Sequence, residues 1–237
     1  MKHVLSFSGG KDSTALLLKM IEEKMQIDRI ICIDTTKEFP EMYEHIEKVK
    51  RYIEPYGSVI EIIKIDFDYW FSEHIKTRGK RKGNKEGYGW PDFRNRWCTA
   101  LKRSAFKKTV PGKDVLEYHG ISFDETERTD KNKDGRDIEY PLIDWKMTGG
   151  DCIEYCYSKG FDWGGLYDKM SRVSCWCCPL SRIGELKILH DEYPDLWTEL
   201  KSMDCKSYRK FRNDYSVDEL TDKFKAQRHR VSRRPRY

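Results

Sequence analysis

Short apolar runs alternate with longer amphipathic stretches through the first half of the chain. The runs have the length and branched aliphatic content of buried strands, and they fall at residues 4–5, 29–34, 59–65 and 115–121. Between the first three, residues 14–21 are mostly good helix formers, and residues 40–56 carry apolar side chains at helical spacing. This alternation predicts βαβ units, and so an α/β fold with a doubly wound, mostly parallel sheet that has helices on both faces.

The pattern changes near residue 170. From Ile183 onward, apolar residues at helical spacing predict two amphipathic helices that are separated near Pro194. We therefore expect two domains. The α/β domain covers residues 1–170, and residues 171–237 form a small helical extension that contains a cysteine motif and many basic residues.

The turn between the first predicted strand and helix carries the first chemical signal. It reads Ser6-Phe7-Ser8-Gly9-Gly10-Lys11-Asp12-Ser13. A glycine turn at a helix N-terminus points free backbone N–H groups and the positive end of the helix dipole at one place, which suits a phosphate. The glycines let the backbone approach the anion, and Lys11 adds a positive charge. The spacing does not fit a Walker A loop.

Composition narrows the class of protein. Hydrophobic residues make up 38% of the 237 residues and charged residues 36%, which supports a core with a strongly solvated surface. No apolar stretch approaches the roughly 20 residues that a membrane-spanning helix needs. The N-terminus does not resemble a signal peptide, so we expect a cytoplasmic protein without a membrane partner. Eight cysteines in a reducing compartment point to metal or redox chemistry.

Positive charge is concentrated in two segments. Six of the ten residues at 76–85 are Lys or Arg, and the tail from Arg228 to Arg236 holds five arginines and no acid. Each segment is either a solvated surface stretch or a contact surface for an anionic partner. The first would then act as a mobile basic lid. Their combination favours a nucleic acid, tRNA or DNA, as the macromolecular partner.

Several motifs resemble one family. Ser-Gly-Gly-Lys-Asp-Ser at 8–13 resembles the pyrophosphate loop of PP-loop ATPases, relatives of the phosphoadenosine phosphosulfate (PAPS) reductases. Further PAPS reductase-like segments follow in the family's order, from residue 4 to about residue 180. They are Asp34-Thr35 with Phe39-Pro40-Glu41, Arg96-Trp97-Cys98-Thr99, Pro141-Leu142 with Trp145, and Gly165-Leu166-Tyr167-Asp168. The resemblance implies the adenine nucleotide alpha-hydrolase-like fold, with residues 1–170 as the nucleotide-binding domain.

The resemblance also implies the residues that bind the nucleotide. Lys11 would offset charge on the phosphoryl oxygens, and Asp12 would fix the loop or help to hold Mg²⁺. The implied ATP-binding set is Ser6, Ser8, Gly9, Gly10, Lys11, Asp12, Ser13, Asp34, Thr35, Gly120 and Glu125.

Two departures from the family pattern bear on the reaction. Where PAPS reductases carry Gly-x-Arg-x-x-Glu-Ser, this chain keeps Gly120 and Glu125 but has Ser122 in place of the arginine. The reductases also have a C-terminal Glu-Cys-Gly-Leu-His segment, whereas no cysteine follows Cys205 here. We therefore expect a reaction other than PAPS reduction.

A cysteine motif at 175–178, Cys-Trp-Cys-Cys, is the second chemical signal. A Cys-x-x-Cys pair turns two thiolates toward one point, which favours zinc or an iron–sulfur cluster. By resemblance to relatives with the same pair, Cys98, Cys175 and Cys178 would bind one metal centre. Cys205 is the nearest fourth ligand, although that position could also stay open, and Cys177 could replace either member of the pair. A [4Fe–4S] cluster is the first expectation, with Zn²⁺ or buried reduced thiols as alternatives.

Three functions are compatible with these features. The first is an ATP-dependent enzyme that adenylates a substrate oxygen and releases pyrophosphate, after which sulfur, with a possible sulfur-donor protein, displaces AMP from tRNA or DNA. The second is a sulfonucleotide reductase or sulfotransferase that acts on a small substrate. The third is a non-catalytic nucleotide- and metal-binding module of a larger complex.

Overall fold

A computed structural model describes residues 1–129, 135–173 and 175–232, with the side chains of 228–232 outside the description. The chain divides into two compact units. The first unit combines Met1–Ile65 with Leu101–Val173, and the second combines Asp66–Ala100 with Ser174–Tyr237. The second unit therefore joins a segment from the middle of the sequence to the C-terminal region.

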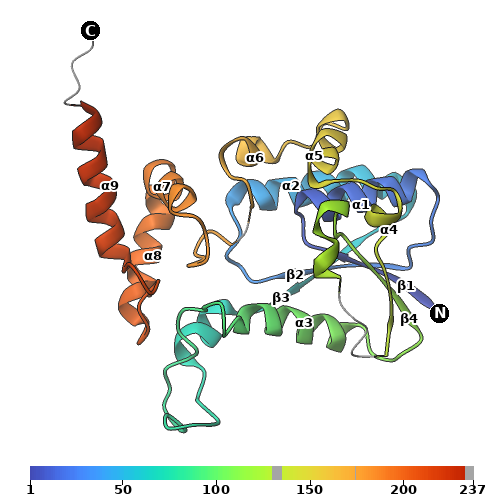
Figure 1. Ribbon diagram of the computed structural model, residues 1–237. Coiled ribbons are helices and arrows are strands. Elements are labelled where there is room, and N and C mark those ends of the chain that lie inside the picture. Colours follow the sequence, from blue (N-terminus) through green and yellow to red (C-terminus); the bar gives the residue numbers. More distant parts are fainter. Residues whose placement is uncertain (130–134, 174, 233–237) are drawn as a thin grey trace. The chain divides into compact units, whose positions relative to one another are not determined.

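Five parallel strands form the sheet of the first unit, in the order β3-β2-β1-β4-β5 (Figure 1). Their bounds are β1 Lys2–Phe7, β2 Arg29–Asp34, β3 Ile60–Lys64, β4 Val115–His119 and β5 Asp137–Glu139. The strand order reverses between β1 and β4, and this confirms the predicted doubly wound α/β sheet. The sequence did not predict β5, because a three-residue edge strand with the sequence Asp-Ile-Glu has almost no apolar signal.

Helices cover both faces of this sheet. Figure 1 shows α1 (Lys11–Glu22), α2 (Pro40–Ile53) and α5 (Gly149–Ser158) on one face, and α3 (Trp97–Thr109) on the other. The shorter elements of this unit are α4 Pro141–Asp144, α6 Leu166–Lys169, and the 3₁₀-helices η1 Glu54–Tyr56, η3 Phe123–Arg128 and η4 Trp163–Gly165.

The core of the first unit lies on both sides of its central strand. Val4 and Leu5 of β1 are fully buried, as expected for a parallel strand that is covered by helices on each face. Phe106 of α3 and Val110, which directly follows that helix, pack with Val4 and Ile31 against one face. On the other face, α5 runs beside α1, which buries its apolar residues from Ala15 to Met20. The sheet and α1 therefore form a rigid support for the turn that joins them.

The second unit contains three packed helices, α7 (Ile183–Glu192), α8 (Pro194–Lys206) and α9 (Val217–Ser232). Pro194 is the first residue of α8, which confirms the predicted break between two C-terminal helices. Trp197 of α8 packs against Phe224 of α9 and His190 of α7. The same unit contains the π-helix η2 (Tyr69–Glu73) and an antiparallel pairing of Ile75 with Lys85.

Across the described residues, none of the helices combines the length and the apolar character needed to cross a lipid bilayer.

Candidate functional site

The turn from β1 to α1, residues 8–10, needs glycine at its second position. Gly9 has φ +75°, in the left-handed region that side chains disfavour. A Cβ added there would lie 2.9 Å from the Met42 sulfur and 3.2 Å from Ile46 Cγ1, both on α2. Glycine is therefore required both by the backbone conformation and by the close approach of α2.

The N-terminus of α1 is left without a side-chain cap. Its N-cap residue is Gly10, and no side chain accepts a hydrogen bond there in the way a capping Ser or Asp would. Within the described residues, no acceptor is found for the backbone N–H groups of Asp12 and Ser13, which point out of the first turn. This leaves donors and the positive end of the helix dipole available to an anion.

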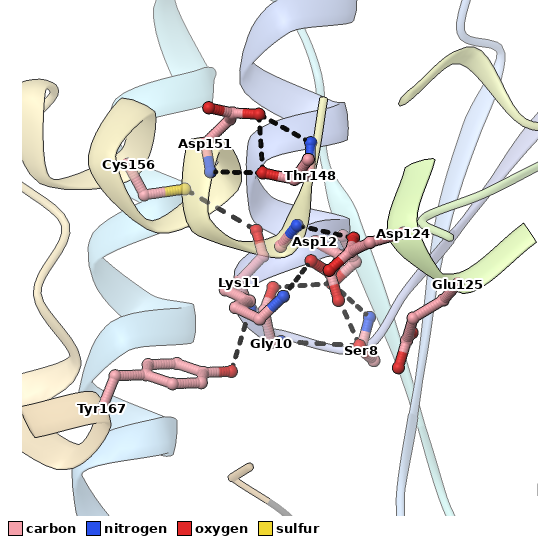
Figure 2. A network of polar contacts seen from close by, with 12 residues as sticks. Ser8, Gly10, Lys11, Asp12, Asp124, Glu125, Thr148, Asp151, Cys156 and Tyr167 are labelled. Atoms are coloured by element: carbon pink, nitrogen blue, oxygen red, sulfur yellow. Dashed lines mark hydrogen bonds and ion pairs between the residues drawn. The ribbon is translucent and has the colours of Figure 1, made fainter. Parts of the chain in front are cut away.

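Two serine hydroxyls cross-link the turn (Figure 2). Ser13 Oγ lies 3.0 Å from Ser8 Oγ, accepts a hydrogen bond from Ser8 N at 3.1 Å, and donates to the Gly10 carbonyl at 3.1 Å. Ser8 itself is exposed, whereas Ser13 is buried. Ser13 therefore fixes the shape of the turn, and Ser8 presents its hydroxyl at the surface.

Aromatic residues from η4 and α6 support the turn from outside. Trp163 Nε1 donates to the Gly9 carbonyl at 2.8 Å, and the Tyr167 hydroxyl accepts from Lys11 N at 3.0 Å. His45 of α2 stacks on Trp163, with ring centroids 4.3 Å apart, and its Nε2 lies 3.0 Å from Thr14 Oγ1. Burial lowers the pKa of His45 to about 3, so its ring is neutral near pH 7.

Charged side chains gather in front of the turn. Lys11 Nζ contacts Asp12 Oδ1 at 2.5 Å, and Figure 2 shows Asp124 and Glu125 on the same side. Burial raises the pKa of the Asp12 carboxyl, an effect that its hydrogen bond to Lys11 opposes. Asp124 accepts a hydrogen bond from Gly149 N at 2.8 Å, and this bond holds its pKa below the usual range. The site thus combines one lysine with several carboxylates, an arrangement suited to a nucleotide that arrives with a divalent cation.

The end of β4 lies directly against this turn. A Cβ added to Gly120 would be 2.8 Å from Ser13 N and 2.9 Å from the Asp12 carbonyl carbon, so only glycine fits. Ser6 of β1 pairs with His119 of β4 and Ile31 of β2, which places the ends of these strands at one edge. Ligands bind at this edge in open α/β sheets, where the strand order reverses.

The remaining predicted residues have structural partners of their own. Asp34 is buried at the end of β2, where its Oδ1 accepts from Thr36 N at 2.7 Å and from the Tyr43 hydroxyl at 3.1 Å. Thr35 beside it is also buried. Glu125 is partly exposed and forms an ion pair with Arg128. Asp34 therefore shapes the β2–α2 turn, while Glu125 stays accessible beside Asp12.

Sequence reasoning missed three groups that form this site. Trp163 and Tyr167 lie about 155 residues beyond the turn in sequence, and Asp124 is joined to the N-terminus of α5. The segment at 165–168 did carry a family motif, which was the available signal for Tyr167. No pattern of spacing indicated that its hydroxyl contacts Lys11 N.

The predicted metal ligands belong to the second unit but do not form a cluster. Cys98, Cys175, Cys178 and Cys205 all fall within its segments. Among the described residues, no three His, Cys, Asp or Glu side chains lie close enough to hold a metal ion. The present arrangement therefore does not fit a metal centre, and metal binding by these cysteines stays a prediction. By contrast, Cys152 and Cys156 are buried in α5 behind Lys11, where burial raises the pKa of both thiols.

The basic segment 76–85 forms an ordered turn. Lys76 N donates to the Asn84 carbonyl at 3.0 Å, and Gly83 N donates to the Lys76 carbonyl at 2.8 Å. The cations rest on aromatic rings, since Lys76 Nζ lies 4.5 Å from the Tyr88 ring and Arg81 Cζ lies 4.2 Å from the Tyr208 ring. The side chains of the second basic segment, from Arg228 to Arg236, lie outside the described part of the chain.

Comparison with known proteins identifies a family and two similar proteins that we describe here. The family model described as the phosphoadenosine phosphosulfate reductase domain matches residues 2–181. An uncharacterized protein of Methanocaldococcus jannaschii is 28% identical over 214 residues, which cover 84% of this chain and 41% of that protein. The chain thus spans less than half the length of this relative.

A solved structure, the U34-tRNA thiolase NcsA from Methanococcus maripaludis with its [4Fe-4S] cluster, matches with a TM-score of 0.45 and 12% identity. The match covers 96% of this chain and 71% of that one. At that TM-score the likeness supports no conclusion about the present chain.

Proposed function

Because this chain belongs to the phosphoadenosine phosphosulfate reductase domain family, we propose that it is an ATP-dependent PP-loop enzyme that adenylates an oxygen of its substrate. Sulfur transfer to a nucleic acid is the overall reaction that we propose. The observation that carries the proposal is the uncapped N-terminus of α1, which lies at the strand-order reversal beside Lys11 and Gly120.

The proposed chemistry has two steps. A substrate carbonyl oxygen attacks the α-phosphorus of ATP, so that a new O–P bond forms, the bond to the bridging oxygen breaks, and pyrophosphate leaves. Hydrosulfide then attacks the activated carbon, and AMP departs with the former substrate oxygen, so that the carbon now carries sulfur and the hydrosulfide proton. Sulfur replaces oxygen without any change in the oxidation state of that carbon.

The residues of the turn have separate roles in the first step. Backbone N–H groups at the start of α1 would bind the departing pyrophosphate, and the Ser8 hydroxyl would add a donor. Lys11 Nζ would neutralise charge that develops on the phosphoryl oxygens, and Asp12, whose carboxylate already holds Lys11, would orient it. Mg²⁺ would accompany ATP, with Asp12 and Glu125 as the nearby carboxylates.

Exposed positive charge supports a nucleic-acid acceptor, tRNA or DNA. The segment 76–85 holds six basic residues, almost all exposed, and no acid. Contacts with Tyr88 and Tyr208 hold Lys76 and Arg81 in place, and the other four basic side chains are exposed. A cationic surface of this kind binds a phosphate backbone by releasing counterions.

The test is to identify the products formed from ATP. Incubation of the protein with ATP, Mg²⁺, sulfide and tRNA should yield AMP and pyrophosphate, with much lower release when tRNA is omitted. Lys11→Ala should lower the rate by roughly 10²- to 10³-fold, as expected for the loss of one electrostatic contact to the transition state. Lys19→Ala is the matched control, because Lys19 lies on the same helix but pairs with Glu23, away from the turn.

Two results would contradict this proposal. Formation of ADP and phosphate would exclude attack at the α-phosphorus. Release of sulfite from a sulfonucleotide in the presence of thioredoxin would favour reductase chemistry on a small substrate.

The cysteine prediction has its own test, since no step above is assigned to a metal. Iron, sulfide and zinc are measured in protein purified without oxygen, alongside a Cys178→Ser variant. A [4Fe–4S] cluster would give about four irons and four sulfides per chain, and these should be lost in the variant. If the wild-type protein contains none of the three elements, the prediction of a metal centre is refuted.

A further inference from the structure

The second unit contains a pocket of about 340 Å³ that the function above does not use. Three stretches of chain form its walls: residues 90–93, Pro179 with Leu180, and residues 209–214. The volume falls within the range of small-ligand pockets, roughly 300–1,000 Å³. All three stretches belong to the same compact unit, so the pocket is a property of that unit alone.

The floor of the pocket is aromatic and rigid. Trp90 and Phe211 are each 1% exposed and pack edge to face, with ring centroids 4.9 Å apart. Trp90 Nε1 donates to Asp204 Oδ1 at 2.8 Å, and Asp204 Oδ2 accepts from Val217 N at 3.0 Å. These contacts fix both rings, so the pocket rests on a preformed aromatic support.

At the rim of the pocket, the exposed ring of Phe93 lies close in sequence to two arginines, Arg94 and Arg96. Phe93 is 75% exposed, an unusual position for a phenylalanine, and Arg96 Cζ lies 5.7 Å from its ring centroid. Asp92 holds this rim in place by accepting from the backbone N–H groups of Arg94 and Asn95 at 2.8 and 2.7 Å. Within the described part of the chain, Arg94 and Arg96 form no ion pair, so both guanidinium groups are open to an anion.

The wall formed by residues 209–214 is polar, and its two arginines already have hydrogen-bond partners. Arg209 pairs with Asp92, and Arg212 donates to the Pro179 carbonyl at 2.7 Å and to Asp214 at 3.0 Å. These bonds connect the residues that follow the cysteine motif to the loop at 209–214. They define the shape of the pocket, whereas the open positive charge lies on the Phe93 side.

We propose that this pocket binds an unstacked base of a single-stranded nucleic acid, with Phe93 stacking on the base and Arg94 and Arg96 contacting the flanking phosphates. Single-stranded segments are recognised by this combination of exposed aromatic rings and cations. An apolar peptide segment would not make use of the two unpaired arginines, so charge complementarity favours the nucleic acid. The inference rests on the proposed function, because it names where that acceptor is held.

The location of the pocket adds a reason for this choice. Its wall at Pro179 directly follows Cys178, and its rim at Phe93 lies five residues before Cys98. A base held here would therefore be bound by the two segments that carry the candidate cysteines. The base would then lie beside segments whose cysteines have no other assigned role.

The test measures binding without ATP, which separates it from the test of catalysis. A fluorescent 15-nucleotide single-stranded RNA is titrated with the full chain, and fluorescence anisotropy gives Kd over a range of salt concentrations. Phe93→Ala should weaken binding by roughly 5- to 150-fold, the effect of losing one base–aromatic stack, with an unchanged salt dependence. Arg94→Ala should weaken binding and lower the slope of log K against log salt by about 0.7. Tyr56→Ala and Arg51→Ala, exposed residues of the first unit, are the matched controls.

Two further arms distinguish other ligands. Free AMP at millimolar concentration should compete weakly, and a duplex RNA of the same length should bind without sensitivity to Phe93→Ala. Wild-type affinity of Phe93→Ala for the single strand would overturn the proposal, even if tRNA still stimulates pyrophosphate release. Conversely, if RNA binding depends on Phe93 but no pyrophosphate is released, the proposed binding site is supported and the proposed reaction is refuted.

Discussion

Substitution of Gly9 by alanine tests the central turn most directly. The change adds one methyl group at a residue with φ +75°, where its Cβ would meet the Met42 sulfur at 2.9 Å and Ile46 Cγ1 at 3.2 Å. Two costs are expected, a backbone cost for a left-handed non-glycine residue and a packing cost against α2. Either α2 shifts or the turn opens, and both would displace the N–H groups at the start of α1.

A second glycine separates these two costs. Gly57 has φ +71°, almost the same as Gly9, but no atom lies within 4 Å of the position its Cβ would take. Gly57→Ala should therefore lower the free energy of unfolding only by the cost of a left-handed non-glycine residue, about 1–2 kcal/mol. Gly9→Ala should lower it by that amount and by a further cost of about 1–3 kcal/mol for the crowding against α2. For a chain of this size the difference corresponds to roughly 2–12 °C in Tm.

The assay is differential scanning calorimetry of both variants, with ATP affinity measured by isothermal titration calorimetry. Gly9→Ala should show the larger fall in Tm and should lose most of its ATP binding, whereas Gly57→Ala should bind ATP like the wild type. Equal Tm values for the two variants would refute the argument that α2 crowds the turn. Unchanged ATP binding in Gly9→Ala would refute its role as a phosphate loop.

Three other predictions follow from buried contacts of the first unit. Arg136 and Glu117 form a buried ion pair at 2.6 Å, so Arg136→Leu should lower the free energy of unfolding by roughly 3–5 kcal/mol in urea denaturation, and adding Glu117→Leu should restore part of that loss. Tyr167→Phe removes the acceptor of Lys11 N, and should lower the same free energy by about 0.5–1.5 kcal/mol, against no change for the exposed Tyr69→Phe. His45, whose pKa falls from 6.5 to about 3 on burial, takes up a proton only on unfolding between these values. Its contribution to the free energy of unfolding should therefore be fully present above about pH 6.5. Below that pH the free energy of unfolding should fall by up to about 1.4 kcal/mol per pH unit, and His45→Gln should reduce this slope.

The sequence predicted the sheet and the phosphate turn because both are encoded locally. A buried parallel strand such as β2 is a continuous apolar run, and the structure confirms its bounds at Arg29–Asp34. The glycines of the turn are adjacent in sequence, so their chemistry could be deduced without the fold. The three-residue strand β5 was not predicted, because it is a strand by virtue of its pairing with β4 and not of its own composition.

The contacts that complete the site could not be predicted, because they join residues far apart in sequence. Trp163 reaches the Gly9 carbonyl across 154 positions, and only the packing of η4 against α2 brings the two together. The pocket beside Phe93 depends in the same way on three separate stretches of chain. A single exposed phenylalanine in a basic segment has no periodicity that would mark it as part of a pocket.

The division of the chain gives these proposals a common consequence. The phosphate turn and all residues that support it belong to the first unit, while the aromatic pocket and the candidate cysteines belong to the second. No contact of the turn described above involves Phe93, and none of the pocket contacts involves Gly9. Mutations without shared partners usually have additive effects. The Gly9→Ala, Phe93→Ala double variant should therefore combine the Tm shift of the first substitution with the loss of RNA affinity of the second. A deviation from additivity in RNA affinity in the presence of ATP, but not in its absence, would show that nucleotide binding and acceptor binding are coupled.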